Sequence, residues 1–371
     1  MELTYRFKLR LLSTKKHRLL LDTIYAFRDC VNDWLAIIRE LEQNGEKPTV
    51  KRIHELGYEK LKQKYYPLLQ SDTIQDAMNW ALQTYKSWKK VGGEFPKFEA
   101  LLVSFKGVQA KLENDGLIVS LNGQRLFLPL HIPKKFKKLF QHKHGRVYIK
   151  REGKNWYAYI SFKVPEKEPI KPVGVIGVDL GIRNFLVASN EKGREVLRIS
   201  GEEMLKRREE YQRRRKLLQQ HLMKDKGIKE AKLGQKERRW VNQFNHEVAR
   251  KLVLVARQQN RAIAVEKLKG LKRNNNGKSR KLNKLLHDWP YADLLQKIKY
   301  KAKLYGVPVI EVSPRGTSKT CSRCGYYHKK FREQAVFKCP KCGFTADRDY
   351  NASVNIARKG LEKIMSNSSQ P

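Results

Sequence analysis

The chain has 371 residues, of which 79 are lysine or arginine and 37 are aspartate or glutamate, so its formal net charge is +42. Apolar residues make up 40% of the sequence, which argues against a disordered chain, and the length allows two or three domains with cores of their own. So large a positive charge repels itself unless a polyanion neutralises it, and we therefore expect nucleic acid as the partner. A ribosomal or membrane-surface protein is the less favoured alternative.

Basic residues occur in every third of the sequence, which predicts a long binding channel rather than a charged tail. The clearest runs are residues 134–138, 206–208, 213–216 and 280–281. No stretch of about eighteen apolar residues is present, and the first residues are typical of a strand rather than of a leader. We therefore expect an intracellular protein without a membrane partner.

The first half of the sequence predicts helices inserted into a small barrel. After an opening strand, residues 1–12, apolar residues recur at helical spacing, so residues 13–94 are predicted as a bundle of three helices, the last capped by Ser71. Residues 95–165 form short alternating runs separated by turns, which predicts a small antiparallel β-barrel. Because the opening strand finds no partner in a helical bundle, we expect it to join the barrel.

The second half alternates strands and helices after a proline-rich linker at residues 166–172. The predicted elements are strands at 173–182, 184–189 and 195–199, a long basic helical region at 202–259, a strand at 261–266, a helix at 289–305, a strand at 307–312 and a last helix. This order is typical of an RNase H-like sheet. The predicted fold class is therefore multidomain, with an α+β first half and an α/β second half.

Three acids fall where this order of elements would bring them together. Asp179 ends the first strand of the sheet, Glu266 closes the fourth, and Asp349 opens the last helix. Three gathered carboxylates repel one another unless cations lie between them, and their oxygens suit Mg²⁺ or Mn²⁺. We predict them as catalytic residues and magnesium ligands, with two ions for phosphodiester hydrolysis. Asp347 is a rival to Asp349 but is more typical of a helix cap, and Glu311 has a weaker claim.

Four of the five cysteines form two pairs with the spacing of a zinc site. The four ligands predicted for one Zn²⁺ are Cys321, Cys324, Cys339 and Cys342. Four thiolates leave no open position for water, so we expect a structural ribbon that supports a loop beside the active site rather than zinc catalysis. Cys30 follows the apolar stripe of the first helix and is predicted as plain core.

Four short motifs mark the second half of the sequence. They are residues 177–184 (GVDLGIRN), 265–268 (VEKL), 313–325 (SPRGTSKTCSRCG) and 347–356 (DRDYNASVNI). Together they resemble the TnpB family of transposon-encoded nucleases, to which the type V CRISPR effectors are related. In that family the last catalytic acid stands two residues before the asparagine that is Asn351 here, which favours Asp349 over Asp347.

The resemblance implies a domain plan for the whole chain. Residues 1–12 and 95–165 correspond to a wedge barrel, and residues 13–94 to inserted recognition helices. Residues 173–312 and 345–371 correspond to a RuvC-like nuclease domain, with the zinc ribbon at 313–344 inserted in it.

The resemblance also implies an activity and its partners. The protein would be an RNA-guided DNA endonuclease of the prokaryotic cytoplasm, a monomer on one guide RNA that binds target DNA next to a short adjacent motif. The helix around residues 204–220 would then contact phosphates through a basic cluster. The predicted contacts are Lys206, Arg207, Arg208, Arg213, Arg214 and Arg215.

Two alternative functions stay open at this point. One is an RNA-guided DNA-binding repressor without nuclease activity, although the presence of all three acids counts against it. The other is a transposase that acts without RNA, because RNase H-like folds host such enzymes too.

Overall fold

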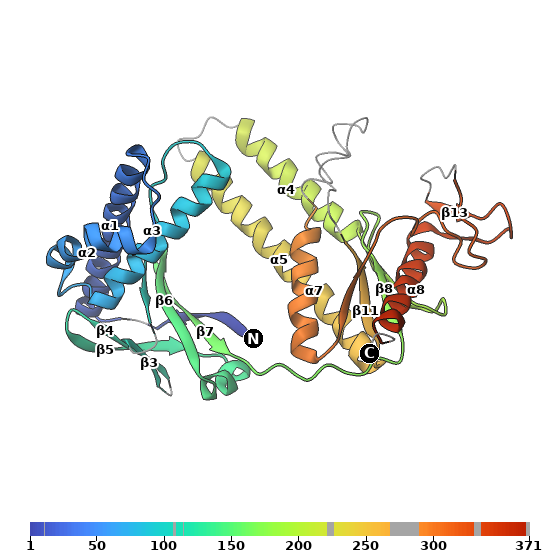
Figure 1. Cartoon of the computed structure of the whole chain (residues 1–371), viewed down its shortest axis with the longest axis horizontal. Coiled ribbons are helices and arrows are strands. Elements are labelled where there is room, and N and C mark those ends of the chain that lie inside the picture. The colour runs from blue at the N-terminus through green and yellow to red at the C-terminus, as the bar shows by residue number, and fades with distance from the viewer. Residues whose placement is uncertain are drawn as a thin grey trace. The chain divides into compact units, whose positions relative to one another are not determined.

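The computed structural model describes residues 1–10, 12–106, 109–113, 115–220, 226–267, 289–329 and 335–368. It consists of two compact units, Met1–Pro165 and Glu166–Pro371 (Figure 1). Among the described residues, no helix combines the length and the apolar character that crossing a membrane requires.

A seven-stranded antiparallel sheet forms the framework of the first unit. Its strands are β1 (Glu2–Leu9), β2 (Leu102–Phe105), β3 (Ala110–Glu113), β4 (Gly116–Leu121), β5 (Gln124–His131), β6 (His144–Glu152) and β7 (Asn155–Lys163). They pair in the order β2-β6-β7-β1-β5-β4-β3. The first strand lies between β7 and β5, so the prediction that it joins the later strands is confirmed.

The sheet is a half-barrel, which agrees in part with the predicted small antiparallel barrel. Its two edge strands, β2 and β3, do not pair with each other, and no other described strand closes the gap. Helices α1 and α3 pack against β2 instead, and cover that end of the sheet. A short 3₁₀ helix, η2 (Lys134–Gln141), contains the first basic run and connects β5 to β6.

Three helices follow the first strand, as predicted: α1 (Thr14–Gln43), α2 (Val50–Tyr65) and α3 (Ser71–Val91). The hydroxyl of Ser13 caps α1 by accepting from the amide of Lys16 at 3.4 Å. The predicted cap of α3 is wrong by one residue, because Ser71 is already helical and Gln70 provides the first accepting carbonyl. Cys30 is fully buried in the core of the unit, as predicted.

A five-stranded mixed sheet forms the centre of the second unit. Its strands are β8 (Val175–Asp179), β9 (Asn184–Asn190), β10 (Glu195–Ser200), β11 (Ala262–Glu266) and β12 (Val309–Val312). They pair in the order β10-β9-β8-β11-β12. The first three strands are antiparallel hairpins, whereas β11 lies parallel to both β8 and β12, and this agrees with the predicted order of elements.

Helices cover both faces of this sheet. They are α4 (Glu202–Gln220), α5 (Lys226–Gln258), α7 (Tyr291–Tyr305) and α8 (Arg348–Ser368). Side chains alternate along β8, so Ile176 and Val178 pack with residues of α5 and α7, whereas Val175 packs with Ile356 of α8. Figure 1 shows α7 and α8 on opposite sides of β8 and β11.

Helix α8 lies directly on strand β8 at a glycine. A Cβ atom at Gly177 would come within 2.1 Å of the Ser353 carbonyl oxygen and 2.2 Å of the Ala357 amide nitrogen. Only a residue without a side chain allows the two backbones this close. The contact fixes the position of α8 against the end of the strand that carries Asp179.

The segment between β12 and α8 forms the cysteine ribbon. It contains two short antiparallel strands, β13 (Val336–Lys338) and β14 (Thr345–Asp347), and a small core of Phe337 with three of the cysteines.

Alanine at position 177 is expected to be strongly destabilising, because its Cβ atom meets backbone rather than a flexible side chain. We predict that Gly177→Ala lowers the free energy of unfolding by about 3 kcal/mol, seen as an earlier melting transition. Gly234→Ala is the matched control, since Gly234 lies in α5 and a Cβ atom there meets nothing within 4 Å. It should raise stability by about 0.5–1 kcal/mol, and equal melting of the two variants would contradict the close contact.

Candidate functional site

Two of the predicted acids end neighbouring parallel strands on the same face of the sheet. The register pairs Ala264 with Gly177 and Val265 with Val178, and one further step would pair Glu266 with Asp179. Side chains along a strand point alternately to the two faces of the sheet. Asp179 lies two residues after Gly177, and Glu266 lies two residues after its partner Ala264, so both acids belong to the face that α8 covers. The sequence places them there because the apolar run of each strand ends at its acid.

The third acid, Asp349, reaches this place from the first turn of α8. Its Oδ2 atom accepts from Asn184 Nδ2 at 2.9 Å, and its Oδ1 atom pairs with Arg348 Nε at 3.3 Å. A Cβ atom at Gly181, in the turn after β8, would lie 3.5 Å from Asp349 Oδ2. Asp349 is 5% exposed, so its carboxylate is buried over the turn that follows Asp179.

The electrostatics of Asp179 indicate that the three acids act on one another. Burial raises the pKa of Asp179 well above its usual range, and the charges of Glu266 and Asp349 raise it further. The guanidinium of Arg348 opposes these effects only in part. A buried carboxylate whose ionised form is disfavoured by neighbouring carboxylates is typical of a functional site.

Glu266 interacts with Thr317, in the loop before the first cysteine, and with Lys359 of α8. Burial raises its pKa, while a hydrogen bond from Thr317 and the charge of Lys359 act in the opposite direction. The Thr317 Oγ1 atom lies 2.5 Å from Glu266 Oε1.

Asp347 serves as the cap of α8. Its Oδ1 atom accepts from the amides of Asp349 and Tyr350, both at 3.1 Å, and its carboxylate pairs with Arg183 and Arg198. These contacts confirm the interpretation of Asp347 as a cap.

Glu311 contributes nothing to the acidic cluster. It lies within β12, and its carboxylate pairs with Lys299 of α7.

The donor set of the three acids suits a hard divalent cation. Carboxylate oxygens are the ligands that Mg²⁺ and Mn²⁺ prefer, and after burial the charges of Glu266 and Asp349 raise the pKa of Asp179. Within the described part of the chain, only the four cysteines have ligand atoms that all lie within 4.8 Å of one another, so the acids are spaced more widely than that.

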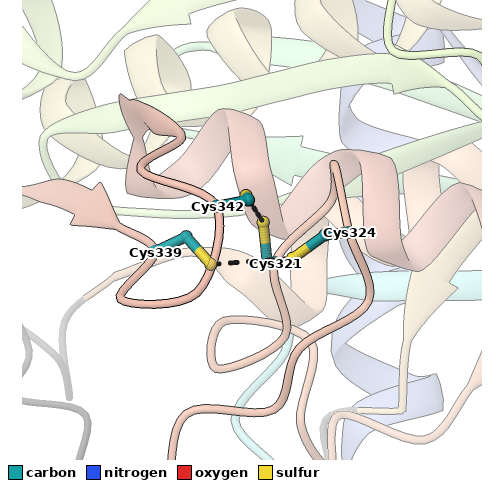
Figure 2. A group of neighbouring side chains, drawn as sticks. All are labelled: Cys321, Cys324, Cys339 and Cys342. Atoms are coloured by element: carbon teal, nitrogen blue, oxygen red, sulfur yellow. Dashed lines mark hydrogen bonds between the residues drawn. The ribbon is translucent and has the colours of Figure 1, made fainter.

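The four predicted cysteines converge on one point (Figure 2). The distances from Cys321 Sγ to Cys342 Sγ and from Cys324 Sγ to Cys339 Sγ are both 3.7 Å. Zinc–sulfur bonds of about 2.3 Å in a tetrahedron place sulfurs about 3.8 Å apart, so the cluster fits Zn²⁺ without rearrangement. Each pair of cysteines ends in a glycine with positive φ, Gly325 at +74° and Gly343 at +67°, which lets the backbone turn around the metal position.

The six predicted nucleic-acid contacts all lie on α4. They are Lys206, Arg207, Arg208, Arg213, Arg214 and Arg215. Three of them pair with glutamates of α4 itself, and Arg215 pairs with Glu237 of α5. The guanidinium of Arg208 lies 5.7 Å from the ring centre of Trp289. The basic run at residues 280–281 lies outside the described residues.

Several residues of the site were missed by the sequence interpretation. Asn184 and Thr317 hold the carboxylates, and Tyr291 lies close enough that the charges of Asp179 and Asp349, after burial, raise its pKa. Tyr291 opens α7 directly after a proline, and nothing in that local pattern distinguishes it from an ordinary helix start.

Two family models match segments of this chain. The one described as "Probable transposase" matches residues 159–275, and the one described as "Cas12f1-like, TNB domain" matches residues 291–356. The second match spans α7, β12, the ribbon and the first turns of α8. Each match covers less than half of the chain.

Comparison with curated relatives identifies the family of the chain. A TnpB-like protein of Aquifex aeolicus is 30% identical over 232 residues, which cover 56% of this chain and 74% of that protein. A CRISPR-associated endodeoxyribonuclease Cas12f1 of Syntrophomonas palmitatica is 32% identical over 265 residues, which cover 60% of this chain and 52% of that protein. The chain belongs to the TnpB-like family, as its motifs predicted, and it spans about half the length of the Cas12f1 relatives.

A solved structure shows the same fold. The cryo-EM structure of a Cas12f1–sgRNA–target DNA complex matches with a TM-score of 0.66 at 19% identity, covering 93% of this chain and 82% of that chain. The chain therefore has a Cas12f-like multidomain α/β fold that includes the half-barrel sheet.

Neutralising Asp179 should stabilise the metal-free protein. An acid whose pKa is raised by folding is protonated more readily in the folded state, so its contribution to stability falls as pH rises above the unfolded value of about 3.9. We predict that Asp179→Asn raises Tm at pH 7 in EDTA, by about 2–4 °C for each kcal/mol relieved, and that the gain disappears towards pH 4.

The matched control for this experiment is Asp347→Asn. This variant keeps an acceptor for the helix cap but removes the charge that pairs with Arg183 and Arg198, so it should gain no stability. A lower Tm for Asp179→Asn than for the wild type at pH 7 would show that the acids do not repel one another.

The ribbon should depend on its metal. We predict that the wild type purifies with about one zinc ion per chain and that Cys321→Ser loses the ion and melts earlier, because the four thiols without metal have no other partners of comparable strength. Cys30→Ala is the control, since Cys30 lies in the other unit and should leave the zinc content unchanged. Elemental analysis and thermal melting measure both effects.

Proposed function

We propose that this protein is an RNA-guided DNA endonuclease. It binds a guide RNA derived from its transposon and recognises target DNA next to a short adjacent motif. It then hydrolyses the DNA with Asp179, Glu266 and Asp349 as its catalytic residues. The observation that carries the proposal is the meeting of these three carboxylates from β8, β11 and α8 at one edge of the second sheet.

The topology of the second unit supports a RuvC-like assignment. Three antiparallel strands followed by parallel strands connected through helices are the order of an RNase H-like sheet. Asp179 and Glu266 lie at the ends of its central strands, and Asp349 lies in the first turn of α8. The first unit would be the wedge, and its helices α1–α3 the recognition domain. The Cas12f1 relatives named above are endodeoxyribonucleases, which fits a hydrolytic role for the acids.

The chain's own residues would prepare the site for Mg²⁺ or Mn²⁺. Two such ions, when bound, supply the activation of water and the stabilisation of the leaving 3′ oxygen in phosphodiester hydrolysis. Asp179, Glu266 and Asp349 would hold them through their carboxylate oxygens. Asn184 fixes Oδ2 of Asp349, so that this carboxylate keeps its orientation before substrate arrives.

The cysteine cluster has a different task in this proposal. Its four thiolates would bind one structural Zn²⁺ and leave no position for water, so hydrolysis does not involve the ribbon directly.

Charge supports nucleic acid as the partner of both units. A chain of +42 needs a polyanion, and guide RNA provides one along its whole length. Arg207 and Arg214 of α4 pair with Glu210, and such exposed pairs are weak enough to be exchanged for phosphates. Base pairing between guide and target would then read the sequence, while the protein holds the duplex by its backbone. We propose one protein molecule per RNA, in the prokaryotic cytoplasm.

A transposase that acts without RNA is the second candidate, favoured by the match of residues 159–275 to the "Probable transposase" model. Purification from the native locus, followed by sequencing of any bound RNA and incubation with target DNA and Mg²⁺, separates the candidates. Bound RNA that directs cleavage supports the proposal. Cleavage that ignores an added guide favours the transposase, and bound RNA with intact DNA favours a guided repressor.

Alanine at Asp179, Glu266 or Asp349 is predicted to lower the cleavage rate by about three orders of magnitude or more, because the three acids act as a unit. Binding of RNA and target DNA should persist, which gel-shift measurements check. Asp347→Ala is the matched control and should mainly lower stability, by about 1 kcal/mol through the lost cap. Cleavage that survives in Asp349→Ala but is lost in Asp347→Ala would overturn the assignment.

A further inference from the structure

The loop between β12 and the first cysteine, residues 313–320, contacts a proposed catalytic acid from the side of the ribbon. Thr317 is 3% exposed, and its Oγ1 atom lies 2.5 Å from Glu266 Oε1 and 2.9 Å from the carbonyl oxygen of Pro314. A hydroxyl has one proton, so it can donate to only one of these acceptors at a time. The carboxylate is the nearer acceptor, and an ionised acceptor makes the stronger bond.

Helix α8 holds the same loop from the other side. The Nδ2 atom of Asn355 donates to the carbonyls of Thr317 at 2.8 Å and Thr320 at 2.7 Å. Asn351 Nδ2 also donates to the carbonyl of Thr320, at 2.8 Å, and its Oδ1 atom accepts from the amide of Ser322 at 2.8 Å. Both asparagines are buried, so water cannot easily replace these bonds.

The ribbon is connected to the same loop by backbone contacts. The amide of His328 donates to the carbonyl of Lys319 at 3.0 Å, and Thr320 pairs with Tyr327 across an isolated bridge. At the start of the loop, Gly316 has φ +84°, and the Tyr327 ring lies 3.3 Å from where a Cβ atom would stand. The loop is thus held between α8 and the ribbon, and its hydroxyl is directed at Glu266.

We propose that Thr317 is a positioning residue for Glu266, and that Asn351 and Asn355 tie it to the helix that carries Asp349. The inference deepens the proposed nuclease function and rests on it. In this arrangement one rigid loop relates an acid at the end of a strand to an acid at the start of a helix, although the two elements belong to distant parts of the sequence. The ribbon, while not a catalytic group itself, keeps that loop in place.

A purely structural role for Thr317 is the alternative. The carbonyl of Pro314 alone could satisfy the buried hydroxyl, and the bond to Glu266 would then have no effect on the acid. The two roles differ in their effect on metal binding, because partners that orient a ligand typically contribute 10–100-fold to metal affinity.

The test is the affinity for Mn²⁺, measured by calorimetry on zinc-loaded full-length protein without RNA or DNA. Thr317→Val keeps the shape of the side chain but removes the hydroxyl, and should weaken Mn²⁺ binding by about 10–100-fold. Thr317→Ser restores the hydroxyl and should bind within about threefold of the wild type. Thr345→Val is the matched control, since that hydroxyl donates to the carbonyl of Gly343 in the ribbon, and the variant should leave Mn²⁺ affinity unchanged.

A second experiment tests the hydrogen bonds between Asn355 of α8 and the loop. Asn355→Ala removes both bonds to the loop and should weaken Mn²⁺ binding by about tenfold or more, while the zinc content, measured separately, stays at about one ion per chain.

The outcomes separate this inference from the proposed function. A wild type that binds Mn²⁺ together with a Thr317→Val variant of equal affinity overturns the positioning role and leaves the nuclease proposal standing. A wild type that binds no Mn²⁺ overturns both. If Thr317→Val and Thr317→Ser weaken binding equally, the side-chain methyl rather than the hydroxyl matters, and the inference fails.

Discussion

The contact between helix α8 and strand β8 at Gly177 is the constraint on which the acidic site depends. With no side chain between them, the two backbones meet, and the first turn of the helix then lies beside the end of the strand. Asp349 and Asp179 are brought together by this contact rather than by any attraction between them, since their charges repel. Packing energy elsewhere on α8, for example around Ile356, offsets that repulsion.

The acidic cluster therefore lowers the stability of the folded protein, and the cation of the proposed function would restore it. Burial and mutual repulsion disfavour the ionised form of Asp179, and the nearby cation Arg348 relieves only part of this. Neutral donors, Asn184 and Thr317, orient the other two carboxylates without cancelling their charge. A site stabilised by lysines and arginines alone would be more stable but would leave less negative charge for a metal.

Much of this could be predicted from the sequence, because the signals were local. An apolar run that ends in an acid predicted both Asp179 and Glu266, and two Cys-x-x-Cys pairs predicted the ribbon. The remaining features depend on distant contacts: Thr317 lies 51 residues from its partner Glu266, and no local pattern connects them. The open edge of the first sheet could not be predicted for the same reason, because it is covered by helices whose docking the strand pattern does not reveal.

The buried asparagines of α8 also bear on how the protein is made. The ribosome delivers the chain from its N-terminus, so Asp179, Glu266 and the ribbon emerge before the helix that completes their surroundings. Until then, the backbone of β8 at Gly177 is bare, and the carbonyls of Thr317 and Thr320 lack the Asn355 donor. The acidic centre is thus complete only once α8 has been synthesised, and a nascent chain without α8 has no complete centre.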